Sequence, residues 1–292
     1  MSLNTIRWDL DVVALSSIVH RGSDNDSVGT DTTSSFRTER ILTSEGELLS
    51  VPIVSGSSFR GVLRRIGEEL TAAVLDYEDV ALPVAAAHLL TNGGRLAKSA
   101  RPFTDEDERN LKALLPQIAV FGGAASNRIM SGLLTVGKVL PEVAELAHIL
   151  PRPPRTTPLS SVFTFAEESF THLSDHRPRA DQAPHTDGDG DTTSPLGRFD
   201  VETLPAGTVF QTGVRLANAT IGQVAFMHDV LSTFASRGHL GGRIASGHGS
   251  VTAIFSNIEV ERGHLPDYNT VDWQAELKAH RNEAIAALSK IT

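Results

Sequence analysis

Two amphipathic helices, each preceded by predicted strands, constrain the fold of this chain more than any other feature. Apolar residues at helical spacing run from Phe59 to Val74 and again from Ile221 to Phe234, and Gly238 ends the second stripe. Before the first helix, the alternation of Ile, Val and Leu in Thr5–Ile18 predicts a strand. Further strands are predicted over residues 36–42, 47–54, 132–139, 198–203, 208–216 and 248–255.

This order predicts an α+β fold in which an antiparallel sheet carries helices on one face. The ferredoxin-like βαββαβ arrangement fits it best. Other helices are predicted over residues 82–90, 105–118 and 271–289, so the segments 76–150 and 159–200 become insertions in the core. Residues 172–197 are polar and rich in Asp, Pro, Gly and Thr, which predicts a flexible segment in the isolated protein.

The composition excludes several classes of function. The chain of 292 residues has no cysteine, so disulfides, zinc–cysteine sites and cysteine nucleophiles are excluded. It has no apolar run of membrane-spanning length, and residues 1–20 lack the layout of a signal peptide. A cytoplasmic protein without a membrane partner is therefore expected.

The charge distribution points to an anionic partner even though the net charge is −9. Acidic residues cluster at 105–108 and at 175–191, away from the predicted core helices. The stretch 36–65 instead carries five arginines against three glutamates. Because phosphate responds to the local field, a basic surface can act within an acidic chain.

The first candidate site is the serine–glycine turn at 55–58, which leads into the first helix. Ser57 or Ser58 is expected to cap this helix, and free backbone N–H groups at a helix start favour an anion. Arg60 follows in the first turn, where it opposes the helix dipole. A bound phosphate would relieve this conflict, because arginine pairs with phosphate bidentately. A capped surface helix with solvated arginines is the alternative interpretation.

The second candidate is the glycine-rich loop 238–249, which contains Gly241, Gly242, Arg243 and His248. Glycines allow the backbone of a ligand to approach closely. Arg243 and His248 could then touch phosphate or sugar. An ordinary turn between helix and strand is the alternative.

Two catalytic alternatives stay open. Asp31, in the polar loop after the first strand, could hold a divalent ion or align an RNA hydroxyl, or it could be a simple turn residue. A small-molecule hydrolase built on the Gly56 turn is the second, although Arg60 stands where a G-x-S-x-G elbow needs glycine. No Walker sequence is present, the Asp187–Asp191 run departs from a calcium loop, and no metal or cofactor is expected.

Four motifs in order resemble the RAMP superfamily of CRISPR-associated proteins, which have modified ferredoxin-like (RRM-like) folds. The segment 51–64 is similar to the family's P-x-x-x-G-S-S-(L/F)-(K/R)-G-x-(L/M)-R helix start. Val120-Phe121-Gly122-Gly123 resembles its Phe-Gly step, and Leu204–Phe210 resembles its P-x-G-(T/V)-x-F turn. Residues 241–249 resemble its terminal glycine-rich loop, so the likeness spans residues 5–256.

The resemblance implies a backbone subunit of a CRISPR effector ribonucleoprotein, of the type IV (Csf-like) or type III (Csm-like) kind, and the doubled arginine at 64–65 favours type IV. Copies of such a subunit stack as a helical homo-oligomer along guide RNA (crRNA), present it to target nucleic acid and contact other effector subunits. The subunit is expected to be non-catalytic. In type III relatives an aspartate placed like Asp31 cuts target RNA, so a metal-dependent ribonuclease is the alternative.

The resemblance also implies boundaries and contacts. An RRM-like palm core is expected at 1–75 and 201–256, an inserted helical or lid region at 76–158, a thumb-like flexible insertion at 159–200 and a C-terminal helix at 257–292. Arg60, Arg64 and Arg65 are expected to grip guide phosphates. The full set of expected RNA-binding residues is Arg37, Arg40, Ser57, Ser58, Arg60, Arg64, Arg65, Arg128, Gly241, Gly242, Arg243 and His248.

Overall fold

The main sheet of the protein is antiparallel, with strand order β12–β1–β11–β7, and β8 adds to β11. The computed structural model describes residues 3–22, 33–77, 80–98, 102–171, 198–268 and 270–291. The strands of this sheet are β1 (Asn4–Ala14), β7 (Leu134–Val136), β8 (Leu140–Pro141), β11 (Val209–Ala219) and β12 (Val251–Arg262).

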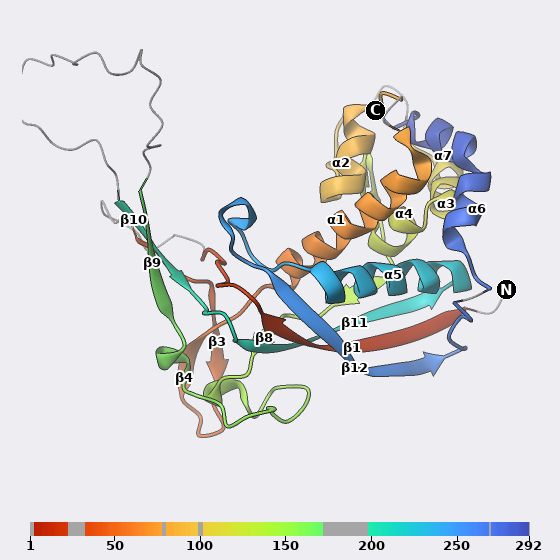
Figure 1. Ribbon diagram of the computed structural model, residues 1–292. Helices are drawn as coiled ribbons and strands as arrows, with labels where there is room; N and C mark the ends of the chain where they lie inside the picture. The colour runs from red at the N-terminus through yellow and green to blue at the C-terminus, as the bar shows by residue number, and fades with distance from the viewer. Residues whose placement is uncertain are drawn as a thin grey trace, which may run out of the picture.

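Two long helices, α1 (Gly56–Leu75) and α5 (Ile221–Arg237), lie across one face of this sheet (Figure 1). The alternation in β1 sends Ile6, Trp8, Leu10 and Val12 into the core beneath them, where each is fully buried. The rings of Phe59 in α1 and Phe234 in α5 join the two helices at 5.1 Å. The predicted α+β class and the βαββαβ order, β1–α1–β7–β11–α5–β12, are both present.

Two further helices, α2 (Val84–Asn92) and α4 (Pro116–Phe121), pack against α1, and α3 (Asp105–Leu114) packs against α4. The short hairpin of β5 (Gly123–Ala125) and β6 (Arg128–Met130) follows them. Their apolar residues belong to the same core cluster as the sheet. The expected boundary at 76–158 is therefore too wide, because β7 and β8 within it are strands of the main sheet.

The C-terminal region also differs from the expectation. β12 continues to Arg262, so the first residues of the expected segment 257–292 are part of the sheet. The predicted single helix is divided into α6 (Trp273–Ala279) and α7 (Arg281–Leu288), because His280 leaves helical geometry between them. Trp273 and Leu277 are buried, and the Trp273 ring meets Phe226 of α5 at 4.9 Å.

Two smaller units stand at the other end of the molecule (Figure 1). The strands predicted over residues 36–42 and 47–54 are present as the hairpin of β3 (Thr38–Leu42) and β4 (Leu48–Pro52). This hairpin shares a small apolar cluster with the turn η2 (Ala144–Leu146). The second unit, here called the thumb arm, pairs β9 (Ala166–Thr171) with β10 (Arg198–Thr203), and β2 (Thr33–Ser34) lies beside β10. The turn η3 (Ser161–Phe163) precedes β9 and η5 (Ile244–Ser246) precedes β12.

Two sequence predictions fall outside the described residues. These are Asp31 and the segment 172–197 of the thumb-like insertion. Within the described ranges, every helix is too short or too polar to cross a lipid bilayer.

Candidate nucleic-acid interface

The start of helix α1 is capped by Ser55, not by the expected Ser57 or Ser58. The Ser58 N–H donates to Ser55 Oγ at 3.3 Å, and Ser55 has the extended backbone of an N-cap residue. Ser57 is exposed, and its Oγ lies 3.2 Å from Ser55 Oγ. The first turn holds no acidic residue, so its N–H groups face no carboxylate from their own helix.

His20 completes this turn from the end of the first strand region. Its Nε2 accepts the Ser55 N–H at 3.2 Å, which requires a neutral ring with a free lone pair there. Burial, followed by the charge of Arg37, lowers the pKa of His20 below its usual value. A neutral His20 cannot add to the basic surface, and it does not serve as a base for Ser57 while it holds the Ser55 N–H. The hydrolase alternative gains no support here.

Two predicted contact residues, Arg60 and Arg64, point into the protein. Arg60 donates to the carbonyls of Leu134 at 2.6 Å and Phe121 at 2.8 Å. Arg64, with 7% of its surface exposed, donates to the carbonyls of Phe121, Gly122 and Leu89 at 2.8, 3.0 and 3.2 Å. Burial lowers the pKa of Arg60, and burial together with the charge of Arg60 lowers that of Arg64 to about 10.

These bonds have a structural purpose. Phe121 and Gly122 lie at the end of α4, and Leu89 lies near the end of α2, where the last carbonyls of a helix have no partner within the helix. The two guanidinium groups donate hydrogen bonds to these carbonyls, and their positive charge is attracted to the negative C-terminal ends of both helices. Arg60 and Arg64, here called the inner arginines, therefore stabilise the fold. Their predicted contact with phosphate stays a prediction.

Arg128 is also engaged within the chain. Its guanidinium pairs with Asp105 at 2.6 Å and with Glu108, and both carboxylates belong to the first turn of α3. The hydrogen bond to Glu108 and the neighbouring acids raise the pKa of Arg128. Its predicted RNA contact is untested, and the ion pairs compete with it.

Four predicted residues keep exposed guanidinium groups: Arg37, Arg40, Arg65 and Arg243, here called the outer arginines. No ion pair or side-chain hydrogen bond joins any of them to another described residue, in contrast to the inner pair. Arg37 donates its backbone N–H to the His20 carbonyl at 2.7 Å. Burial lowers the pKa of His239, and the nearby charge of Arg65 lowers it further.

The glycine-rich loop is hydrogen-bonded to the residues that follow β1. The Gly242 N–H donates to Val19 O at 2.7 Å, and the Gly249 N–H donates to Ser17 O at 2.8 Å. Gly241 has φ +77°, and a Cβ there would lie 2.1 Å from Val19 O, so only glycine fits. Gly241 thus lets the loop lie directly against Val19, whereas Gly242 is exposed and has room at its Cβ position. The expected contacts of Gly241 and Gly242 with RNA stay predictions.

The two charged residues of the loop differ. Arg243 is exposed, and its guanidinium lies over the ring of Phe170 in β9 at 4.4 Å. His248 is 6% exposed, its Nδ1 lies 2.9 Å from Ser17 Oγ, and its ring meets Phe170 edge-on at 5.4 Å. Burial removes the His248 ring from direct reach of a nucleic acid in this conformation, so its expected contact lacks support.

The segment Ser17–Gly22 is thus the common support of the site. It holds the glycine-rich loop, the start of α1 through His20, and Arg37 through the His20 carbonyl, while Arg40 continues along β3. Sequence reasoning missed Ser17, His20 and Phe170. A histidine directly before the polar loop 21–35 was a signal for His20, but Phe170 meets the loop only through tertiary structure.

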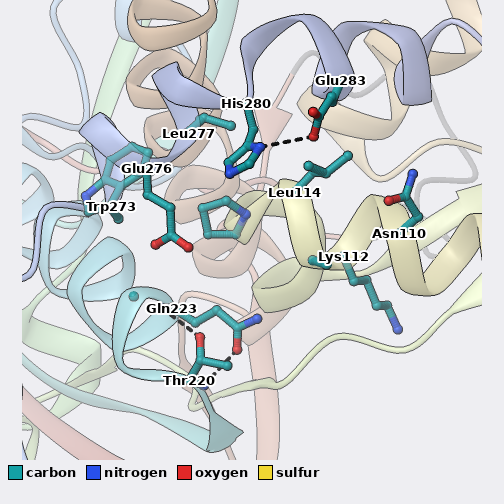
Figure 2. A pocket seen from close by; sticks show the side chains of 13 residues that line it. Asn110, Lys112, Leu114, Thr220, Gln223, Trp273, Glu276, Leu277, His280 and Glu283 are labelled. Atoms are coloured by element: carbon teal, nitrogen blue, oxygen red, sulfur yellow. Dashed lines mark hydrogen bonds and ion pairs between the residues drawn. The ribbon is translucent and has the colours of Figure 1, made fainter. Parts of the chain in front are cut away.

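A pocket lies away from these residues, among α3, the start of α5 and the two C-terminal helices (Figure 2). It encloses about 270 Å³ and contains none of the predicted site residues. His280 pairs there with Glu283 at 3.0 Å, and Thr220 and Gln223 form the capping box of α5. These groups stabilise the ends of helices. Separately, the described part of the chain has no cluster of three or more His, Asp or Glu residues able to hold a metal ion.

Comparisons with known proteins agree with the motifs. The sequence profile of the RAMP superfamily matches residues 29–252. A chain in a solved structure described as "Type IV-B CRISPR Complex" is 53% identical to this one, and the alignment covers 91% of this chain and 97% of that chain with a TM-score of 0.59. No curated protein matched. The profile spans most of the chain, and all four motifs that predicted the family lie inside it, so this protein belongs to the RAMP superfamily of CRISPR proteins.

Proposed function

We propose that this chain is a backbone subunit of a type IV-B CRISPR effector ribonucleoprotein, which polymerises along guide RNA and presents it for pairing with target nucleic acid. Family membership and the identity to a chain of a type IV-B complex support the assignment. The βαββαβ sheet supports a modified ferredoxin-like (RRM-like) palm. Other effector subunits and further copies of this chain would be its protein partners.

The observation that carries the proposal is the set of outer arginines. Arg37 is hydrogen-bonded to the Ser17–Gly22 segment through its backbone, and Arg243 lies in the loop that is held against the same segment. Each outer arginine has an exposed guanidinium without an acidic partner among the described residues. Arginine offers several N–H donors in a fixed plane, which suits the oxygens of successive phosphates. The N–H groups at the start of α1, beside the exposed Ser57, add partial positive charge to the same region.

The thumb arm supports the proposed presentation of the guide RNA for pairing with target nucleic acid. β9 and β10 project beyond the main sheet, and they flank the polar segment expected to form the thumb (Figure 1). We assign the arm to the guide–target duplex, while the palm holds the guide backbone. The inner arginines and Arg128 are left out of the proposed interface.

The proposal gives this subunit no catalytic step. The ribonuclease alternative depends on Asp31. It is tested by incubating the assembled complex with labelled target RNA and magnesium, beside an Asp31→Ala complex. Cleavage by the wild type alone would establish the alternative, and uncut target in both would remove it.

The proposal itself is tested on purified protein. The wild type is expected to co-purify with RNA, giving a high 260/280 nm absorbance ratio, and to form long particles in electron micrographs. A variant with alanine at all four outer arginines is expected to lose both properties. Arg262→Ala is a matched control, since Arg262 is exposed at the far end of β12, about 35 Å along the strand from the glycine-rich loop. A monomeric, RNA-free wild type would overturn the proposal.

A further inference from the structure

The thumb arm meets the glycine-rich loop through Phe170 and Glu168 of β9. Glu168 and Phe170 are two residues apart in β9 and therefore lie on the same face of the arm. Phe170 contacts the guanidinium of Arg243 at 4.4 Å and the ring of His248 at 5.4 Å. Glu168 lies 3.8 Å from His248 Nε2. The arm and the loop are thus joined beside the proposed RNA-binding surface.

The backbone of Arg243 is in a conformation that is unfavourable for a residue with a side chain. Its φ is +56°, in the left-handed region. The Ser246 N–H at 3.0 Å and the His248 N–H at 3.4 Å donate to its carbonyl and hold it there. The loop uses glycine at its other left-handed positions, 241, 247 and 249. An arginine at this position therefore points to a use for its side chain.

The stacking leaves the hydrogen-bonding edge of Arg243 unused. A guanidinium over the face of a ring is attracted through its flat side, so its in-plane N–H donors remain available. Within the part of the chain that the structure describes, the Arg243 side chain donates no hydrogen bond. Arg64, by comparison, donates to three carbonyls.

We propose that Phe170 is a positioning residue of the RNA-binding surface. Its ring orients the guanidinium of Arg243 toward a phosphate of the bound strand. The same contact ties the thumb arm to the loop, so a strand held by Arg243 also restrains the arm. This inference rests on the proposed function, because it assumes that the outer arginines bind RNA.

The experiment measures binding of a fluorescein-labelled 30-nucleotide oligouridylate to the full chain by anisotropy, at several salt concentrations. Arg243→Ala is expected to weaken binding about tenfold and to lower the salt slope by about 0.7, because one phosphate contact is lost. Phe170→Leu is expected to weaken binding about fivefold at an unchanged slope, because the contact persists with poorer orientation. Phe170→Trp keeps a ring face and should bind like the wild type.

A double variant separates positioning from general damage. If Phe170 acts through Arg243, Phe170→Leu combined with Arg243→Ala should bind no more weakly than Arg243→Ala alone. Arg243→Lys leaves the arm intact but removes the planar fork, so it should resemble Phe170→Leu, which keeps the test valid even if Phe170→Leu unfolds.

The inference would be overturned if the losses of the two single variants added in the double variant, or if Arg243→Lys bound RNA as tightly as the wild type. In either case, RNA binding by the wild type would leave the proposed function standing. A wild type that binds no RNA would overturn both.

Discussion

Arg64 and Arg65 are neighbours in the sequence, yet they do opposite things. A helical step of about 100° separates their side chains, and this step carries Arg64 beneath the inserted segment and leaves Arg65 in solvent. Arg64 donates to three carbonyls at the ends of α2 and α4. Arg65 has no partner among the described side chains. In this family member, a basic motif therefore contains both structural and exposed positions, and only the exposed ones are suited to RNA.

The largest expected effect is a difference in stability between variants of Arg64 and variants of Arg65. Arg64→Met leaves the buried carbonyls of Leu89 and Gly122 without a donor, while Phe121 keeps its bond from Arg60, so the free energy of unfolding should fall on the order of 3 kcal/mol. Arg65→Met should change it by less than about 0.5 kcal/mol, as surface substitutions usually do. Urea unfolding followed by circular dichroism measures both. Equal stability of the two variants would contradict the structural role of Arg64.

The next effect is on RNA affinity and concerns the outer arginines. Alanine at Arg37, Arg40, Arg65 and Arg243 should weaken binding of an oligouridylate about 100-fold or more at low salt. The slope of log affinity against log salt should fall by about three, since four single-strand phosphate contacts are lost. Arg262→Ala should change neither quantity. A quadruple variant with the wild-type slope would show that the outer arginines do not contact phosphate.

A smaller effect concerns the support of the site. Gly241→Ala places a Cβ against the Val19 carbonyl in a left-handed conformation, so it should destabilise the protein by on the order of 1–2 kcal/mol. Gly46→Ala is a matched control, because Gly46 has a similar φ of +87° with open space around its Cβ position. If the two variants lose equal stability, close contact with Val19 is not important.

The smallest effect is a pH dependence from His20. Because burial lowers its pKa in the folded state, the unfolded chain binds a proton more readily, and this contribution to stability is present above about pH 6.5. It is lost as the pH falls through the lower folded-state value. Unfolding free energies from pH 7.5 to 5 should therefore decline more for the wild type than for His20→Gln. Parallel curves would contradict a neutral His20 at the start of α1.

Much of the fold could be predicted because its central elements carry strong local patterns. The apolar stripes of α1 and α5 and the alternation of β1 identify these elements without tertiary information. β7 and β8 are only three and two residues long, too short for a period to show that they belong to the main sheet. The break at His280 likewise has no glycine or proline to signal it.

The sequence predicted a basic site, but not which of its arginines are exposed. The sequence places Arg60 and Arg64 off the apolar stripe, and nothing local indicates that residues 116–134 return to cover them. The same limit applies to Phe170, which contacts Arg243 across more than seventy residues of sequence. The burial of His248 also depends on Ser17 and the thumb arm, which are distant in the sequence. Exposure is a property of the folded surface, so sequence reasoning could name the arginines but could not sort them.

The most direct measurement is to map RNA crosslinks on the intact ribonucleoprotein. RNA containing 4-thiouridine would be incorporated, irradiated and digested, and the crosslinked peptides would be identified by mass spectrometry. The account predicts crosslinks in the peptides that contain Arg37, Arg40, Arg65 and Arg243, and in β9 beside Phe170. Crosslinks confined to the pocket of Figure 2 or to the far end of β12, with none at these peptides, would contradict it.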